Sequence, residues 1–324
     1  MEEKVEIMNL LQNKQLLEYE LKSLAYGSVE IRENNSNKYI YVHYREDGIV
    51  LTKYVGEYSD ELYNLVLNNS IKAKELKKQI REINKKLRQL NYTEKELSEK
   101  VEQNIDFAKR NLVDTIYKQA ILEGVATTFA DTESIIEGGK VNNMTTEDIM
   151  KIVNLKHAWE FILNKNVILS DTNFALLCEI NKMVEEGFYY SAGKVRNVPV
   201  TIGGTTWKPE LPIESIIKEE LERIFNSKMD DVDSAIELLL YTMKKQIFID
   251  GNKRTSVIYS NHYLISKGKG IIVIPAELTE EFKDLLIPYY EGKDENQIKK
   301  FIKEKCYLNI YKKRLKLIKN IFKM

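Results

Sequence analysis

A short polar turn, Asp250-Gly251-Asn252, separates two stretches whose apolar residues recur at the spacing of amphipathic helices. This spacing predicts two helices that bury their apolar faces in one core and hold the turn rigidly between them. The apolar residues are Ile236, Leu239, Leu240, Met243 and Ile247 before the turn, and Val257, Ile258, Leu264 and Ile265 after it.

The turn has the composition of an anion site. Asp250 and Asn252 are favoured N-cap residues and Gly251 permits a positive φ, so we expect the second helix to begin here with its amide groups facing the turn. Lys253 and Arg254 add positive charge, while Asp250 supplies a carboxylate suited to Mg²⁺. A metal-bound nucleotide phosphate would fit, but an ordinary capped helix start has the same composition.

The segment Gln246–Arg254 resembles the signature loop of the Fic/Doc (Fido) family, whose pattern is His-x-Phe-x-Asp/Glu-Gly-Asn-Gly/Lys-Arg. The family transfers AMP, or in some members another phosphate-containing group, to a hydroxyl of a protein. The resemblance implies that Phe248 packs the loop into the core and that Asp250 binds Mg²⁺. It implies nucleotide-binding roles, with ATP as the substrate, at Gly251, Asn252, Lys253 and Arg254.

Two positions depart from the family pattern. Gln246 stands where the family has the His that acts as general base, so the expected catalytic residues are Gln246 and Arg254. A carboxamide does not titrate near neutral pH, and loss of a general base lowers a rate by ~10²–10⁴-fold. Val257 stands where many members have a second Arg. The resemblance therefore implies AMP transfer that is weak or altered.

A second resemblance lies upstream, at Glu137-Gly138. It is similar to the inhibitory helix of many Fic proteins, Ser/Thr-x-x-x-Glu-Gly, in which the Glu blocks productive ATP binding. Here Glu133 occupies the Ser/Thr position, and the usual Arg partner of the inhibitory Glu is Val257. An ordinary helix end, stopped by Gly138 and Gly139, would give the same residues.

Residues 193–212 predict a small β-hairpin, because β-branched residues are bounded there by Gly and Pro. In the family, a segment of this kind with Gly-x-x-Arg ahead of it forms a flap that binds the backbone of the target protein as an added strand. The resemblance assigns this role to Val200, Thr201 and Ile202. A connecting loop without a target role is the alternative.

The N-terminal part of the chain changes periodicity twice. A leucine stripe predicts a helix that stops near Gly27, and two β-rich segments, 38–45 and 49–54, then flank Asp47-Gly48, a strong hairpin signal. The aromatic residues of this hairpin could contact nucleic acid. The whole chain has 49 basic and 49 acidic residues, so a nucleic-acid partner is not expected.

The helical period returns between Ser59 and Leu90 with the spacing of a coiled-coil seam, and Thr93 with Glu96 forms a capping box that predicts another helix. We therefore expect a long antiparallel helical pair. It could serve as a partner-binding or dimerising arm that forms a homo-oligomer, or its helices could simply pack on one another.

The whole chain predicts a mainly α fold with three parts. Residues 1–104 form a helix, hairpin and coiled-coil-like arm, residues 105–305 a Fic-type helical domain with a small β-hairpin flap, and residues 306–324 a basic amphipathic helix. Two cysteines, an acidic start and the lack of a membrane-spanning apolar run predict a cytoplasmic protein without a transmembrane segment.

Three functions remain open at this stage. The first is transfer of AMP from ATP·Mg²⁺ to a Ser, Thr or Tyr hydroxyl of a protein. The second is phosphoryl transfer, because Lys253 matches the Asn-Lys-Arg of the Doc branch of the family. The third is a nucleotide-binding regulatory or interaction module without catalytic activity.

Overall fold

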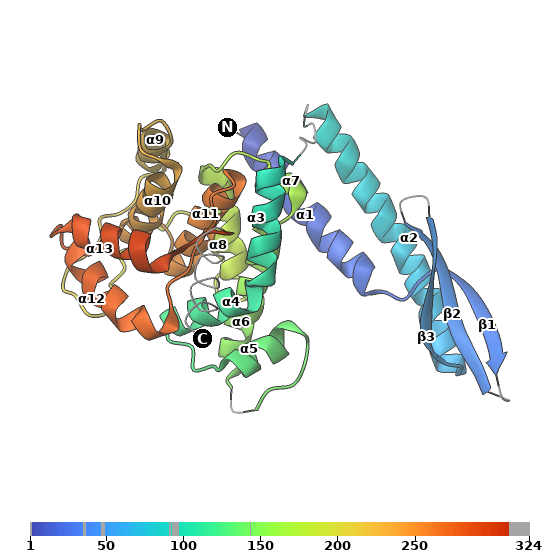
Figure 1. Ribbon diagram of the computed structural model, residues 1–324. Coiled ribbons are helices and arrows are strands. Elements are labelled where there is room, and N and C mark those ends of the chain that lie inside the picture. The colour runs from blue at the N-terminus through green and yellow to red at the C-terminus, as the bar shows by residue number, and fades with distance from the viewer. Residues whose placement is uncertain are drawn as a thin grey trace. The chain divides into compact units, whose positions relative to one another are not determined.

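The computed structural model describes residues 2–34, 37–46, 49–90, 92, 97–142 and 144–310 (Figure 1). The chain divides into two compact units, Met1–Thr93 and Glu94–Met324. This division lies earlier than the predicted boundary after residue 104, because helix α3 (Glu99–Arg110) packs with α4 and α11 of the second unit. The mainly helical fold class is confirmed.

The first unit is a three-stranded antiparallel sheet with two helices. Its elements are α1 (Glu2–Ser23), β1 (Ser28–Asn34), β2 (Asn37–Glu46), β3 (Ile49–Glu57) and α2 (Asp60–Gln89), with sheet order β1-β2-β3. The predicted hairpin of β2 and β3 is confirmed, although its turn residues lie outside the described part. Strand β1, which pairs Val29 with Val42, was not predicted.

Helix α2 covers one face of this sheet. Ile40 and Val42 alternate toward that face and are fully buried with Val66 of α2, as period-two alternation on a half-buried sheet requires. Within this unit α2 packs on α1. The antiparallel pair of α2 with the next helix stays a prediction. The capping box at Thr93 and Glu96 falls outside the described residues.

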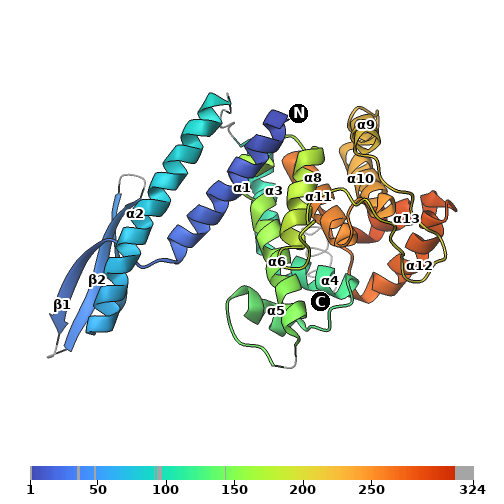
Figure 2. The same ribbon diagram turned by 180° about the vertical axis from the view of Figure 1, so that it is seen from behind.

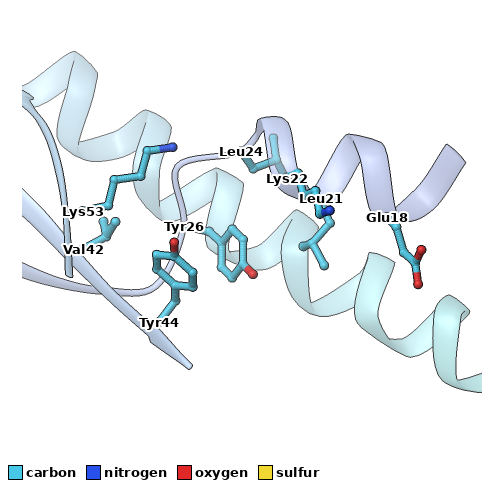
Figure 3. A pocket seen from close by; sticks show the side chains of 8 residues that line it. All are labelled: Glu18, Leu21, Lys22, Leu24, Tyr26, Val42, Tyr44 and Lys53. Carbon is cyan, nitrogen blue, oxygen red and sulfur yellow. The ribbon is translucent and has the colours of Figure 1, made fainter. Parts of the chain in front are cut away.

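A cavity of about 360 Å³ lies in the first unit beside the end of α1 (Figure 3). The rings of Tyr26 and Tyr44 are in tilted contact, with centroids 5.6 Å apart, and both line the cavity together with Lys22 and Lys53.

The second unit is almost entirely helical (Figures 1 and 2). Its elements are α3, α4 (Leu112–Leu122), α5 (Phe129–Ile136), α6 (Thr146–Ile162), α7 (Lys165–Ile168), α8 (Phe174–Val184), α9 (Glu214–Phe225), α10 (Asp231–Lys245), α11 (Asn252–Ser266), β4 (Ile271–Ile272), a 3₁₀ turn (Ala276–Leu278), α12 (Thr279–Tyr290), α13 (Glu295–Phe301), a π turn (Ile302–Cys306) and β5 (Tyr307–Leu308). Strands β4 and β5 pair antiparallel.

Helix α11 lies at the centre of this unit. It packs against α10, α8, α6 and α3, and each of its residues except Lys253 and Ser266 is buried. All nine apolar residues that predicted the helices around the turn are buried, so that prediction is confirmed. A helix buried on every side holds its N-terminus in a fixed position, and that N-terminus is the predicted loop.

Two predicted elements differ from the structure. The segment between Val198 and Pro212 contains no strand, so the hairpin predicted there is wrong. Three prolines, Pro199, Pro209 and Pro212, remove backbone donors that a strand ladder needs. At the C-terminus, Tyr307–Leu308 forms β5, and residues 311–324 of the predicted basic helix lie outside the described part.

Among the described residues, none of the helices combines the length and the apolar character needed to cross a lipid bilayer.

Candidate functional site

The loop between α10 and α11 is held in a backbone conformation that few residues adopt. Gln246 ends α10 in the left-handed region with φ 46°, and it is the one non-glycine residue with positive φ in the described part of the chain. Gly251, with φ 72°, then stands at the N-cap of α11. The turn predicted from the sequence is therefore present, and two left-handed residues bound it.

The side chain of Asn252 stabilises the loop through hydrogen bonds to other loop residues. Its Oδ1 accepts from the Phe248 amide at 3.0 Å, and its Nδ2 donates to the Phe248 carbonyl at 2.8 Å and to Gln246 Oε1 at 3.2 Å. Asp250 and Asn252 were predicted as caps, but the N-cap residue of α11 is Gly251, and no side-chain capping bond to this helix is found among the described residues. The first amides of α11 therefore lack the capping bond that most helices receive from a side chain.

Gln246 takes part in the same network. Its Nε2 donates to the carbonyl of Met243 at 2.7 Å, so both ends of the carboxamide are occupied by the loop itself. Phe248 is 2% exposed and packs into the core.

Arg196 joins the loop to the segment that precedes α9. Its Nε donates to the Gln246 carbonyl at 2.6 Å, its Nη1 to Val198 O at 2.7 Å and its Nη2 to Glu210 O at 2.6 Å. The backbone amide of Arg196 donates to Ile247 O. The guanidinium is buried, and desolvation lowers its pKa from the usual value. This one side chain fixes the predicted flap against the loop.

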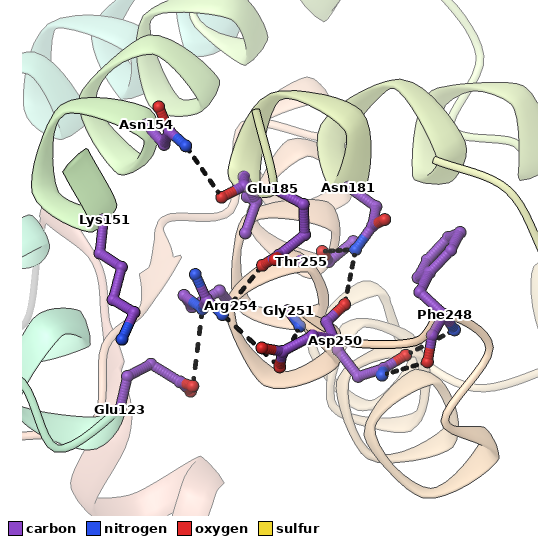
Figure 4. A network of polar contacts seen from close by, with 12 residues as sticks. Glu123, Lys151, Asn154, Asn181, Glu185, Phe248, Asp250, Gly251, Arg254 and Thr255 are labelled. Carbon is purple, nitrogen blue, oxygen red and sulfur yellow. Dashed lines mark hydrogen bonds and ion pairs between the residues drawn. The ribbon is translucent and has the colours of Figure 1, made fainter. Parts of the chain in front are cut away.

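Asn181 of α8 supports the other end of the loop (Figure 4). Its Nδ2 donates to the Asp250 carbonyl at 3.0 Å and to Thr255 Oγ1 at 3.1 Å, and its Oδ1 accepts from the Gly193 amide at 2.8 Å. A buried amide with donors and acceptors all engaged specifies the position of the backbone around it.

Arg254 lies in the first turn of α11, 3% exposed, among three carboxylates (Figure 4). Its Nη2 is 2.9 Å from Glu185 Oε1 and 3.6 Å from Asp250 Oδ1, and its Nε is 3.6 Å from Glu123 Oε2. Nε and Nη1 have no hydrogen-bond partner among the described residues. A buried guanidinium with two unsatisfied nitrogens is costly, and its free N–H groups are suited to an anionic ligand.

Glu185 occupies the space directly above Gly251. A Cβ on Gly251 would lie 2.4 Å from Glu185 Oε1, so the carboxylate rests on the bare backbone of the loop. Burial, opposed by Arg254 and reinforced by the charges of Asp250 and Glu123, raises the pKa of Glu185 to about 7. Glu185 therefore lies against both the Gly251 backbone and the Arg254 guanidinium, with a pKa close to neutral pH.

Asp250 is the most accessible acid of the site, with 54% of its side chain exposed. Its Oδ1 accepts from the Gly251 amide at 2.6 Å. The described residues contain no cluster of three or more metal-ligating side chains. A single exposed carboxylate still fits Mg²⁺, which is commonly bound by one or two carboxylates together with substrate phosphates and water. Asp250 is the residue that could hold such an ion.

The other predicted residues differ in their exposure and in their partners. Glu137 is exposed at the end of α5, whereas the acidic neighbours of Arg254 are Glu123, Glu185 and Asp250. Thr201 of the predicted flap is exposed, and Val200 and Ile202 are half-buried. Lys253 forms an ion pair with Glu123, with its Nζ 3.6 Å from Glu123 Oε1.

The sequence analysis missed Glu123, Asn181 and Glu185. The sequence does contain a signal for Asn181 and Glu185. They are four residues apart, Asn181 in the last turn of α8 and Glu185 directly after it, and the other buried residues of this helix are mostly apolar. Polar groups at buried helical positions are expected to have partners, although their spacing does not say which. Glu123 ends α4 and carries no such signal.

Comparisons with known proteins point to one family. Residues 171–264 match the model of the Fic/DOC family. The structure of Fic-1 (residues 134–508) from C. elegans superposes with TM-score 0.50 at 15% identity, covering 76% of this chain and 73% of that chain. A Fic family protein from Desulfovibrio desulfuricans G20 gives TM-score 0.50 at 14% identity, covering 64% and 72%. No curated protein matches the chain. The matched region contains Asn181, Glu185, Arg196 and the whole loop.

Proposed function

We propose that this chain, which carries a Fic/DOC family domain, transfers AMP from ATP·Mg²⁺ to the hydroxyl group of a Ser, Thr or Tyr side chain of another protein. The observation that carries the proposal is Arg254, a buried guanidinium with two unsatisfied nitrogens at the uncapped N-terminus of α11. Helix N-termini and guanidinium groups both favour phosphate, so ATP would satisfy the groups that the protein leaves unsatisfied.

Each residue of the loop has a role in this proposal. The amides that follow Gly251 and the guanidinium of Arg254 would bind phosphate oxygens and stabilise the charge that develops on them. Asp250 would hold Mg²⁺, which supplies further positive charge beside the phosphates. The ATP phosphates would take the position of the Glu185 carboxylate, so Glu185 must turn away or become protonated when ATP binds.

Gln246 limits the rate of the proposed reaction. In AMP transfer the hydroxyl oxygen bonds to the α-phosphorus, pyrophosphate leaves, and the hydroxyl proton must go to another acceptor. The Gln246 carboxamide cannot take that proton, and both of its ends are already bonded within the loop. Slow transfer is the consequence, and this same feature favours a nucleotide-binding module as the second candidate function.

Labelled ATP separates the candidate functions. The protein is incubated with a cell lysate and ATP that carries the label on either the α or the γ phosphate. Label from the α position on protein supports AMP transfer, and label from the γ position alone supports phosphoryl transfer. ATP binding measured by calorimetry without transfer of either label supports the module. Failure of ATP to bind both the native chain and its Glu185→Gln variant refutes the nucleotide site itself.

A further inference from the structure

A second cavity, of about 550 Å³, is lined in part by Tyr241, Lys244 and Lys245 at the end of α10. It is enclosed by the segment Trp207–Ile213, by α9 and α10, and by Tyr289 of α12. Figures 1 and 2 show these elements grouped at one end of the second unit. We call this cavity the Trp207 pocket and define it by Trp207, Leu211, Tyr241, Lys244 and Tyr289.

Hydrogen bonds of Arg196 connect the wall of the Trp207 pocket to the loop of the candidate active site. Arg196 donates to the carbonyl of Glu210 in the pocket wall and to the carbonyl of Gln246 in the loop, both at 2.6 Å. Lys244 and Lys245 of the pocket directly precede Gln246 in the chain. The wall of the pocket therefore adjoins the loop that carries Gln246.

The pocket offers a rigid aromatic surface. The ring of Trp207 stacks on Tyr290 with centroids 5.8 Å apart and an interplanar angle of 20°. Thr205, two residues earlier, donates its hydroxyl to Glu291 at 2.8 Å, which fastens the same segment to the end of α12. Aromatic side chains that are already fixed lose little conformational entropy on binding, so they act as anchors for apolar groups.

Apolar side chains at the rim are uncovered. Leu211 is 53% exposed and Ile213 is 57% exposed, and both line the cavity together with Ile216. A pocket that combines a fixed aromatic wall with an exposed apolar rim fits the side chain of a partner better than it fits water.

Lys244 is one of the charged residues that line the pocket, together with Lys208, Lys245, Glu210 and Glu220. Its Nζ donates to the Tyr289 carbonyl at 2.8 Å and lies 4.8 Å from the centroid of the Tyr289 ring. Lys245, its neighbour, pairs with Glu220 at 2.7 Å, but Lys244 has no carboxylate within ion-pair distance among the described residues. Partial burial lowers the pKa of Lys244 from its usual value, because water does not fully solvate the ammonium. An anionic ligand would supply the missing partner.

We propose that the Trp207 pocket is a substrate-recognition site that binds an acidic residue next to an aromatic one in the protein that the loop modifies. The aromatic side chain fills the space beside Trp207, and the carboxylate pairs with Lys244. This inference rests on the proposed function for the identity of the ligand as a protein substrate, but the pocket itself does not involve the nucleotide.

The test uses fluorescence of the full-length chain without nucleotide. The chain has two tryptophans, and Trp159 is 1% exposed, so a ligand in the pocket changes mainly the emission of Trp207. The probes are two blocked pentapeptides, Gly-Asp-Phe-Ser-Gly and Gly-Lys-Phe-Ser-Gly, which differ only in the charged residue. We expect the acidic peptide to bind about tenfold more tightly than the basic one.

Two variants complete the test. Lys244→Met keeps an unbranched apolar side chain and removes the charge, and we expect it to weaken the acidic peptide about tenfold without changing the basic peptide. Lys283→Met, on the exposed surface of α12, is the matched control and should change neither affinity. Equal binding of the two peptides, no binding of either, or an unchanged affinity in Lys244→Met overturns the proposal.

The outcome is separable from that of the proposed function. ATP binding by calorimetry is measured on the same preparations. Peptide binding without ATP binding supports the proposed peptide site and refutes the proposed nucleotide transfer. ATP binding and label transfer without peptide binding refute the pocket alone.

Discussion

Two arginines at the two ends of the loop are equally buried and have opposite surroundings. Arg196 and Arg254 are each 3% exposed. Arg196 donates to three backbone carbonyls, those of Gln246, Val198 and Glu210. Arg254 faces carboxylates, and its Nε and Nη1 lack hydrogen-bond partners among the described residues.

This difference indicates that Arg196 has a structural role, whereas Arg254 is available to bind a ligand. Uncharged carbonyls accept hydrogen bonds from all three Arg196 guanidinium nitrogens without neutralising the charge, so Arg196 stabilises the loop conformation. The carboxylates beside Arg254 neutralise its charge without satisfying its hydrogen bonds, an arrangement that a phosphate can improve. The following changes, from the largest expected effect to the smallest, test whether the two ends of the loop differ in this way.

Gln246→His restores a titratable group at the Arg196 end of the loop. We expect the rate of α-label transfer to rise ~10²–10⁴-fold if the rest of the site is competent, because a general base becomes available. His tolerates the left-handed conformation of this position better than most residues. Transfer is measured with α-labelled ATP. An unchanged rate, with ATP still bound, would favour the binding module over the enzyme.

Arg196→Met removes the cation that holds the loop. The free energy of unfolding should fall by about 3 kcal/mol or more, because buried carbonyls lose charged donors. Urea denaturation measures the loss. Arg223→Met, an exposed arginine with 69% of its side chain accessible, is the control and should change stability by less than about 0.5 kcal/mol. Equal effects of the two changes would mean that Arg196 is not structural.

Arg254→Gln tests the opposite end. We expect ATP affinity to fall about a hundredfold, since a buried charged hydrogen-bond donor to phosphate is worth about 1.5–3 kcal/mol. Stability should change less than in Arg196→Met, because the native interactions of Arg254 are incomplete. Calorimetry gives the affinity and denaturation the stability. A large loss of stability with unchanged ATP affinity would reverse the assigned roles.

Glu185→Gln removes the internal anion above Gly251. ATP should bind about tenfold more tightly, because the phosphate no longer competes with a carboxylate for Arg254. Glu179→Gln is the matched control, since Glu179 of α8 is also buried but pairs with Lys182 instead of Arg254. Tighter binding in the control as well would show that the effect does not come from the site.

The pH dependence of anion binding follows from the same residue. Glu185, with a pKa of about 7, faces Arg254, Asp250, Glu123 and Lys151. Above pH 7 it is ionised and pairs with Arg254, and below pH 7 it is neutral and releases Arg254. Sulfate does not titrate in this range, and its affinity should be about fivefold higher at pH 6 than at pH 8. The dependence should vanish in Glu185→Gln, and its persistence there would assign it to another group.

The sequence predicted the loop more accurately than the surroundings of the loop. The helices around it follow from local apolar spacing, and their nine marked residues are buried as predicted. The strand β1 was missed because it is short and has only Val29 and Ile31 as apolar residues. The flap strands were predicted from β-branched residues, but backbone carbonyls in that segment bond to Arg196 instead of forming a ladder.

What the sequence by itself determined is the local chemistry: a rigid turn at Gly251, a cation at Arg254 and a carboxamide at Gln246. Tertiary structure alone decided that Glu123 and Glu185 converge on Arg254 and that Arg196 spans the loop and the Trp207 pocket. The physical reason is that local spacing sets which face of a helix is buried, whereas the pairing of buried charges depends on which distant helices meet.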